Sequence, residues 1–244
     1  NRRGTSVSFV PDTEIFGADA RFDPARIYKL ARSKAYLFAG VEIRWKCAPE
    51  LIADDTPAEA VFQFPGGLAD HLKEQIGDRE CATANFFSGS QDFPGEQQGR
   101  VEWAVAWPLW SDGSYSWYCN TIPTPDGGTH EAGLRAALVR GIRAFGELVG
   151  QKRAKDITAD DVMVGCELML SVFIREPQFQ SQTKDRLTSP EAATMVERAV
   201  RDHFDHFLSD NMDRGKALLG YVVERMDERL RRKQEREVKR KSAT

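Results

Sequence analysis

Residues 167–174, ELMLSVFI, are the feature that most limits what this chain can fold into. Apolar side chains stand at every second position, which is typical of a buried strand: Leu168, Leu170, Val172 and Ile174. The polar stretch EPQFQSQTKDRLTS, residues 176–189, follows, and Ser189 and Pro190 then mark the start of a helical pattern. The sequence therefore predicts a buried strand, an unusually polar loop and a helix in succession.

Strand and helix patterns are mixed along the rest of the chain. Alternating apolar residues predict strands at residues 4–10, 41–47, 61–64, 100–110 and 114–122. Helical spacing of apolar residues predicts helices at residues 24–39, 66–77, 130–149, 190–208 and 213–240. A Ser-Asp-Gly turn at residues 111–113 predicts that the fourth and fifth strands form a long antiparallel hairpin. The Gly-, Ser- and Gln-rich residues 88–99 are interpreted as a surface loop without an assigned role.

Length, charge and cysteine content limit the classes of protein to which this chain can belong. With 244 residues the chain can bury a sizeable core, and its formal net charge of −3 gives no overall attraction to nucleic acid or to an anionic membrane. The four cysteines are far apart and are interpreted as free thiols in a reducing cytosol: Cys47, Cys81, Cys119 and Cys166. No stretch is long and apolar enough to span a bilayer, so we expect a cytoplasmic protein without a membrane partner.

The C-terminal helix is predicted to project from the body. Beyond Leu230 its apolar stripe fades, while charged residues continue to the end. Between Glu224 and Lys241 there are nine basic and five acidic residues. A helix of this kind needs a partner or a neighbouring domain to support it.

Three patterns outside the polar loop could carry a binding site, and each has a simpler structural explanation. His203 and His206 have metal-ligand spacing on a helix, but His203 lies on the apolar stripe, which favours a hydrogen-bonded structural histidine. Two Gly-Gly pairs, at residues 66–67 and 127–128, precede helices and could bind a phosphate, although plain turns are favoured. Basic residues on the 130–149 helix could contact a polyanion or face solvent: Arg135, Arg140 and Arg143.

The polar loop offers Lys184 as a cation that could reach a phosphate and Gln182 as an amide beside it. Judged from the loop alone, a solvated lysine is favoured. The sequence contains no nucleophile with an adjacent base, no pair of carboxylates at catalytic spacing and no metal motif. Any chemistry would therefore depend on residues supplied from elsewhere.

The order of the motifs is more specific than any one of them. GTSVSFVPD, FPGGLADHL, VEWAVAW, NTIPTPDGGTHEAGLRAAL, LSVFIREPQFQSQTKDRLTS and the basic end QEREVKRKSAT follow one another from end to end. In this order they resemble the B subunit of bacterial type II DNA topoisomerases. Within that family the chain is more similar to the topoisomerase IV B subunit than to the gyrase B subunit.

The resemblance implies an α/β fold, the α+β sandwich of a transducer domain of ribosomal-protein-like β-α-β type, with a long C-terminal helix. It implies that residues 1–16 hold the last strand of a GHKL ATPase domain and residues 17–190 the transducer. Residues 191–244 would be helices that lead toward a metal-binding Toprim domain. The motifs of the ATPase and Toprim domains themselves are absent from the sequence.

The resemblance also implies roles for residues and partners. Lys184 would contact the γ-phosphate of ATP with Gln182 beside it, and Arg135 would face the DNA cavity ahead of Arg140 and Arg143. ATP and Mg²⁺ would be held mainly by the ATPase domain, with no metal site in this chain. The protein would dimerise on ATP binding and act on DNA in a heterotetramer with the topoisomerase IV A subunit, and this chain alone would be inactive.

Two other interpretations stay open at this point. The chain could be a stand-alone DNA-binding adaptor that uses the arginine-bearing helix and the basic tail, in which case it would bind duplex DNA tightly by itself at physiological salt. It could also be an independent nucleotide-binding enzyme that uses a Gly-Gly loop, in which case it would bind ATP with Mg²⁺ by itself. A gyrase transducer is the alternative within the family.

Overall fold

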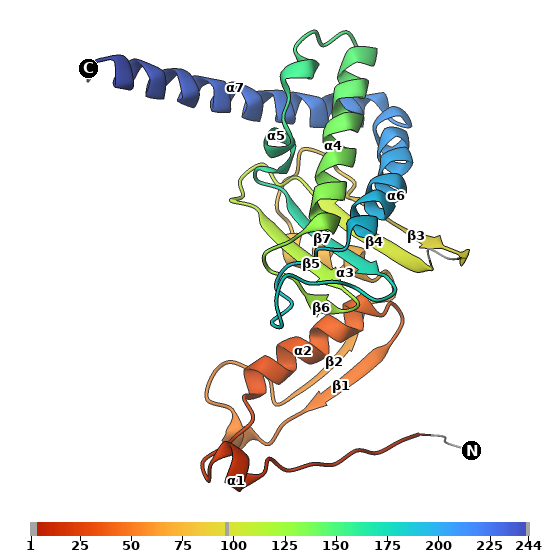
Figure 1. Ribbon diagram of the computed structural model, residues 1–244, viewed down its shortest axis with the longest axis vertical. Helices are drawn as coiled ribbons and strands as arrows, with labels where there is room; N and C mark the ends of the chain where they lie inside the picture. The colour runs from red at the N-terminus through yellow and green to blue at the C-terminus, as the bar shows by residue number, and fades with distance from the viewer. Residues whose placement is uncertain (1–3, 96–97, 243–244) are drawn as a thin grey trace.

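A computed structural model describes residues 4–95 and 98–242 (Figure 1). The helices are α1 (Thr13–Phe16), α2 (Pro24–Leu37), α3 (Leu68–Ile76), α4 (Thr129–Leu148), α5 (Ala159–Met163), α6 (Pro190–Ser209) and α7 (Met212–Ser242). The strands are β1 (Glu42–Lys46), β2 (Glu59–Gln63), β3 (Phe87–Phe93), β4 (Gly99–Ala106), β5 (Ser114–Cys119), β6 (Ile122–Pro123) and β7 (Glu167–Phe173). Short 3-10 helices lie at Pro49–Leu51 and Ala154–Asp156. The predicted mixed α/β class with a long C-terminal helix is confirmed.

A five-stranded sheet with the order β3-β4-β7-β5-β6 separates two layers of helices. Side chains on one face, such as Trp103 and Leu170, pack with α4, α6 and the first half of α7. Side chains on the other face, such as Ala104 and Met169, pack with α2, α3 and the β1–β2 hairpin. The alternation along β4 and β7 thus divides their residues between two cores, as the two-residue period of a strand requires.

β7 is the central strand, and its position shows that the predicted hairpin was wrong. β4 and β5 do not pair with each other, because β7 lies between them, antiparallel to β4 and parallel to β5. The chain reaches β7 from β5 through α4, the long crossover that a parallel pair requires. All residues from Glu167 to Val172 are buried, so this strand needs a hydrogen-bonded neighbour on each side.

The interpretation of residues 88–99 as a surface loop was also wrong. Residues 87–93 form the edge strand β3, which pairs along its whole length with β4. Gly89 lies against the Trp103 ring, where an added Cβ would stand 2.6 Å from a ring carbon. The polar composition of this strand fits an exposed edge. Residues 96 and 97 of the expected loop lie outside the described residues.

The strand predicted at residues 4–10 is not formed within the described part of the chain. Residues 4–12 extend away from the body without pairing to a strand (Figure 1), and Val7 and Phe9 are largely exposed. A strand exists only when a neighbouring backbone completes its hydrogen bonds, and these residues have no such neighbour here. Their assignment to an ATPase domain stays a prediction, as do the divisions at residues 16 and 190.

Residues at the helix ends explain where the helices begin. Asp23 accepts a hydrogen bond from the Arg26 amide at the start of α2, and Pro24 occupies the first turn. Thr158 and Asp161 form a capping box at α5. The second half of α7 projects from the body, as its composition predicted (Figure 1). None of the helices within the described residues is long and apolar enough to cross a membrane.

His71 on α3 is a buried polar group beside the apolar core formed with α2, α3 and the β1–β2 hairpin, which we call the second core. Its ring stacks on Tyr36 with centroids 4.1 Å apart, and the Tyr36 hydroxyl lies 2.8 Å from that of Tyr118 on β5. Burial, with a smaller contribution from Arg32, lowers the pKa of His71 to about 4. The imidazole of the folded chain is therefore neutral at pH values well above 4.

This burial predicts a pH dependence of stability. Between pH 6.5 and about 4 the unfolded chain takes up a proton at His71 that the folded chain does not, so the free energy of unfolding should fall as the pH falls. His71→Phe keeps an aromatic stack. It should reduce the slope of unfolding free energy against pH by the contribution of about one proton. Urea unfolding between pH 7 and pH 4.5 measures it, with the exposed His206→Gln as control. An unchanged slope in His71→Phe would contradict the assignment.

Candidate functional site

The polar loop of residues 176–189 is a short hairpin-like excursion from the end of β7. The Gln180 amide donates to the Arg186 carbonyl at 3.0 Å, and the Thr188 amide donates to the Gln178 carbonyl at 2.8 Å. Phe179 and Leu187 form an isolated antiparallel bridge between these two bonds. Residues 181–184 therefore form the tip of the loop, whereas the Asp185 carbonyl accepts from the Asp126 amide at 2.9 Å.

Two polar side chains fix the base of this loop. The side-chain amide of Asn120 donates through Nδ2 to the Ile174 carbonyl at 2.9 Å. Its Oδ1 accepts from the backbone amide of Ile174 at 3.0 Å. Buried Ser189 accepts from the Gln178 amide at 2.8 Å through its hydroxyl. The Ser189 side chain thus closes the loop instead of capping α6, where no side-chain cap bond is formed.

A contact from α2 holds the turn that carries Asn120. The Lys34 ammonium donates to the Thr121 carbonyl at 2.9 Å and to its hydroxyl at 2.8 Å. Asn120 and Thr121 have φ of +48° and +65°, which is common for an asparagine in a turn but rare for the β-branched Thr121. The second core is thereby connected to the base of the loop.

The second Gly-Gly pair binds the returning strand of the loop. The Leu187 amide donates to the Gly127 carbonyl at 3.0 Å, and the Thr129 amide donates to the Leu187 carbonyl at 3.1 Å. Gly128 has φ of +134°, and a Cβ there would stand 2.1 Å from the Leu187 oxygen. Only glycine allows this approach of two backbones.

Neither Gly-Gly pair is left open for a phosphate, so the plain-turn interpretation holds for both. At α4 the Thr129 amide is already used by Leu187. At α3 the Leu68 amide donates to the Glu102 carboxylate at 3.1 Å, and the Gly66 amide donates to Asp70 at 2.6 Å. Acidic side chains occupy the helix N-terminus where an anion would otherwise bind.

Lys184 and Gln182 are both exposed at the tip of the loop. Lys184 has φ of +62°, an uncommon conformation for a residue with a side chain. Its ammonium lies 5.7 Å from the centre of the Phe179 ring, and within the described residues no carboxylate lies within 4 Å of it. The tip therefore presents a cation whose charge is not neutralised by a neighbouring acid.

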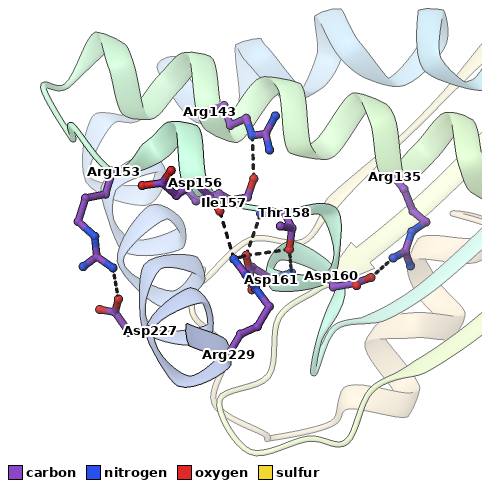
Figure 2. A network of polar contacts seen from close by, with 10 residues as sticks. All are labelled: Arg135, Arg143, Arg153, Asp156, Ile157, Thr158, Asp160, Asp161, Asp227 and Arg229. Carbon is purple, nitrogen blue, oxygen red and sulfur yellow. Dashed lines mark hydrogen bonds and ion pairs between the residues drawn. The ribbon is translucent and has the colours of Figure 1, made fainter. Parts of the chain in front are cut away.

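The three arginines of α4 all have partners on the chain. Arg135 pairs with Asp160 and lies 3.6 Å from Glu131, and Arg140 pairs with Glu197. Arg143 donates to the Ile157 carbonyl at 2.7 Å (Figure 2). The structure does not bring these arginines together with Lys184, and it commits Arg143 to the segment before α5.

Of the two histidines on α6, His203 has structural contacts and His206 is exposed. The His203 Nδ1 lies 2.8 Å from the Ala199 carbonyl, and the His203 ring lies 5.1 Å from that of Trp103. Within residues 4–95 and 98–242, no group of three or more His, Cys, Asp or Glu side chains could hold a metal ion. The structural interpretation of His203 therefore agrees with its contacts.

A family model described as DNA gyrase B matches residues 67–238. The chain belongs to the DNA gyrase B family. This family comprises the B subunits of type II topoisomerases, so the resemblance seen in the motif order is confirmed.

Relatives within the family favour the topoisomerase IV branch. The chain is 53% identical to the DNA topoisomerase 4 B subunit of Bartonella bacilliformis and 51% identical to that of Caulobacter vibrioides, in each case over all of its length. Both relatives are named as subunits of a DNA topoisomerase, which is an isomerase. The chain spans 35% of the length of these two relatives.

Solved structures of the gyrase B family share the fold. The 43K ATPase domain of Thermus thermophilus gyrase B, in complex with an aminocoumarin, matches with a TM-score of 0.75 and 28% identity, over 93% of this chain and 59% of that one. The topoisomerase IV ATP-binding domain of Francisella tularensis matches with a TM-score of 0.73 over 89% of this chain and 57% of that one. At 23% identity this second match bears on the fold alone.

Sequence reasoning missed the residues that hold the loop. Asn120 stands in a turn, where an asparagine with positive φ is ordinary, so no local signal pointed to Ile174. Ser189 was identified as a helix start, although its hydroxyl bonds backward to Gln178. The spacing of the Gly-Gly pair before α4 was a usable signal, because paired glycines often mark a close backbone approach.

Gly128→Ala tests whether the Gly-Gly contact holds the loop. The added methyl group would collide with the Leu187 carbonyl, so the loop should open more easily, by about 1–3 kcal/mol. Amide hydrogen exchange of residues 178–188 should become roughly tenfold faster or more. Gly220→Ala on α7, where a Cβ meets open space, is the matched control. Unchanged exchange in Gly128→Ala would show that the loop is held by other contacts.

Proposed function

We propose that this chain is the transducer part of a topoisomerase IV B subunit. In this role it couples the binding and hydrolysis of ATP, in an adjoining ATPase domain, to the passage of one DNA duplex through another. Decatenation and chromosome segregation in the bacterial cytoplasm are the tasks that such an activity serves. The observation that carries the proposal is Lys184, held out without an acidic partner among the described residues on a loop that is anchored at its base.

The residues that fit ATP are Lys184 and Gln182. A lysine ammonium supplies three donors to a terminal phosphate, and a glutamine amide can bond a phosphate oxygen or a water beside it. Both side chains are exposed, so they can enter a neighbouring domain without moving the body of the chain. ATP would be held mainly by that neighbouring domain, and Mg²⁺ with it.

The anchoring of the loop is what would turn a local contact into a domain movement. Leu187 is hydrogen-bonded to the start of α4, Ser189 begins α6, and Ile174 ends the segment that continues β7. A force on Lys184 therefore acts on three main elements of the body. When hydrolysis weakens the phosphate contact, the loop and the body move together relative to the nucleotide.

The proposal includes the partners that the family implies. These are the ATPase and Toprim domains of the same protein, a second B subunit on ATP binding, the topoisomerase IV A subunit in a heterotetramer, and DNA. Support comes from the relatives named as DNA topoisomerase 4 B subunits, of which this chain matches 35%. Arg135 would approach DNA only by exchanging its contacts with Asp160 and Glu131 for phosphates.

Lys184→Ala tests the proposal in a full-length B subunit that includes the ATPase domain. Loss of the phosphate contact should reduce ATP hydrolysis by about 100-fold or more. Lys184→Gly should behave in the same way, and it removes any objection that alanine is strained at φ of +62°. Steady-state ATP hydrolysis is the measurement.

Lys152→Ala is the matched control, because Lys152 is an exposed lysine in the turn after α4, away from the loop. It should hydrolyse ATP at the normal rate. Near-normal turnover in Lys184→Ala would remove Lys184 from the proposed role.

A further inference from the structure

A groove of about 280 Å³ lies where α7 passes α5. One side is formed by Asp160, Asp161 and Val164, and the other by residues of α7 that follow a helical spacing: Arg225, Glu228, Arg229, Arg232, Lys233 and Arg236. Five of these nine residues are basic. The sequence had indicated only that the end of α7 is rich in charge, without a surface on which the charges gather.

The three acids of the groove are already matched by arginines. Asp161 accepts from Arg229 through both oxygens, at 2.7 and 2.9 Å, and Asp160 pairs with Arg135 on the far side (Figure 2). Glu228 lies 3.3 Å from the Arg225 guanidinium. These carboxylates therefore do not make the groove repel an anion.

Three cations of the groove remain after this matching. Arg232, Lys233 and Arg236 line its outer part, and within the described residues none of them lies within 4 Å of a carboxylate. Arg225, Arg229, Arg232 and Arg236 follow one another at intervals of four, three and four residues. That spacing places them along one face of the helix over about 16 Å.

The groove is held open by contacts outside these three cations. Arg229 also donates to the Asp156 carbonyl at 3.1 Å, and Arg153 pairs with Asp227 on the neighbouring face of α7 (Figure 2). These contacts fix α7 against residues 153–161. The basic row is thus presented by a helix whose position is set before any ligand binds.

We propose that this α5–α7 groove binds the phosphate backbone of duplex DNA. The three outer cations, at the end of an arginine row about 16 Å long, match a ligand with several closely spaced negative charges rather than a single small anion. Such binding is independent of sequence, because the contacts are to phosphates and not to base edges. This proposal rests on the proposed function, in which DNA is the polyanion that the protein acts on. The groove adds a contact surface that is separate from the α4 arginines.

The groove is also a better DNA contact than the α4 arginines. Arg135, Arg140 and Arg143 would each have to leave a protein partner before binding a phosphate. The three outer cations of the groove give up only water. Variants of these three should therefore affect DNA binding more than variants of the α4 arginines.

The test measures binding of the chain to a 30-base-pair duplex by fluorescence anisotropy, without ATP, over a range of salt concentrations. Replacing Arg232, Lys233 and Arg236 by glutamine should weaken binding about tenfold or more at low salt. It should also lower the slope of log affinity against log salt by about 3. Because no nucleotide is present, the outcome is independent of ATP hydrolysis by Lys184 variants.

The matched control replaces Arg198, Arg201 and Lys216, which lie on α6 and the first part of α7. This variant removes the same charge and should keep the salt slope of the wild-type chain. The proposal is overturned if the wild-type chain does not bind the duplex at low salt, or if the two triple variants behave alike. It is also overturned if a poly-glutamate peptide competes for the groove as well as DNA does.

Discussion

The burial of β7 on both faces is the constraint on which the rest of the structure depends. Six consecutive residues of this strand are buried, so its backbone must be paired on both sides and its side chains covered on both faces. β4 and β5 supply the pairing, α4 and α6 cover one face, and α3 covers the other. Removing either neighbour would leave buried amides and carbonyls without partners.

The two ends of β7 lead to the two candidate sites. Its C-terminal end continues through Ile174 into the Lys184 loop, and its N-terminal end follows directly from α5, which lines the groove against α7. Glu167 at the first position is fixed by Arg79, whose Nη2 lies 2.9 Å from the carboxylate. The proposed phosphate contact and the proposed DNA contact are therefore attached to opposite ends of one strand.

Asp161 shows how α7 is kept in position. Burial alone would raise the pKa of this carboxyl, but hydrogen bonds from Arg229 and from Thr158 outweigh it and lower the pKa from its ordinary value. The same carboxylate completes the α5 capping box and holds α7, so a single ionised group serves both elements. Its stabilising effect is present above the unfolded pKa of about 4 and is lost as the pH falls through the lower folded value.

The features that followed from the sequence are local, and those that did not are set by distant partners. Asp23 and Pro190 mark the starts of α2 and α6 through local signals, so helices could be predicted from residues 24 and 190. The sheet order could not, because β7 lies between β4 and β5 although it follows both in the chain. The polar strand β3 was missed for the same reason, since its pairing with β4 outweighs its composition. The same holds at the Lys184 site. The role of Lys184 was inferred from the motif order that resembles the family, whereas the contacts that hold its loop join residues as distant as Asn120 and Ile174.

Coupling between the loop and α7 requires that the material between them moves as one body. Leu187 in the loop and Met226 on α7 are both buried, and both belong to the same apolar core together with α4, α6 and β7. A close-packed core of this kind transmits displacement because its side chains have few alternative arrangements. A pull on Lys184 would therefore be delivered at α7 as a rotation of the whole unit. The basic groove, fixed to that unit by Arg229 and Asp161, would turn with it.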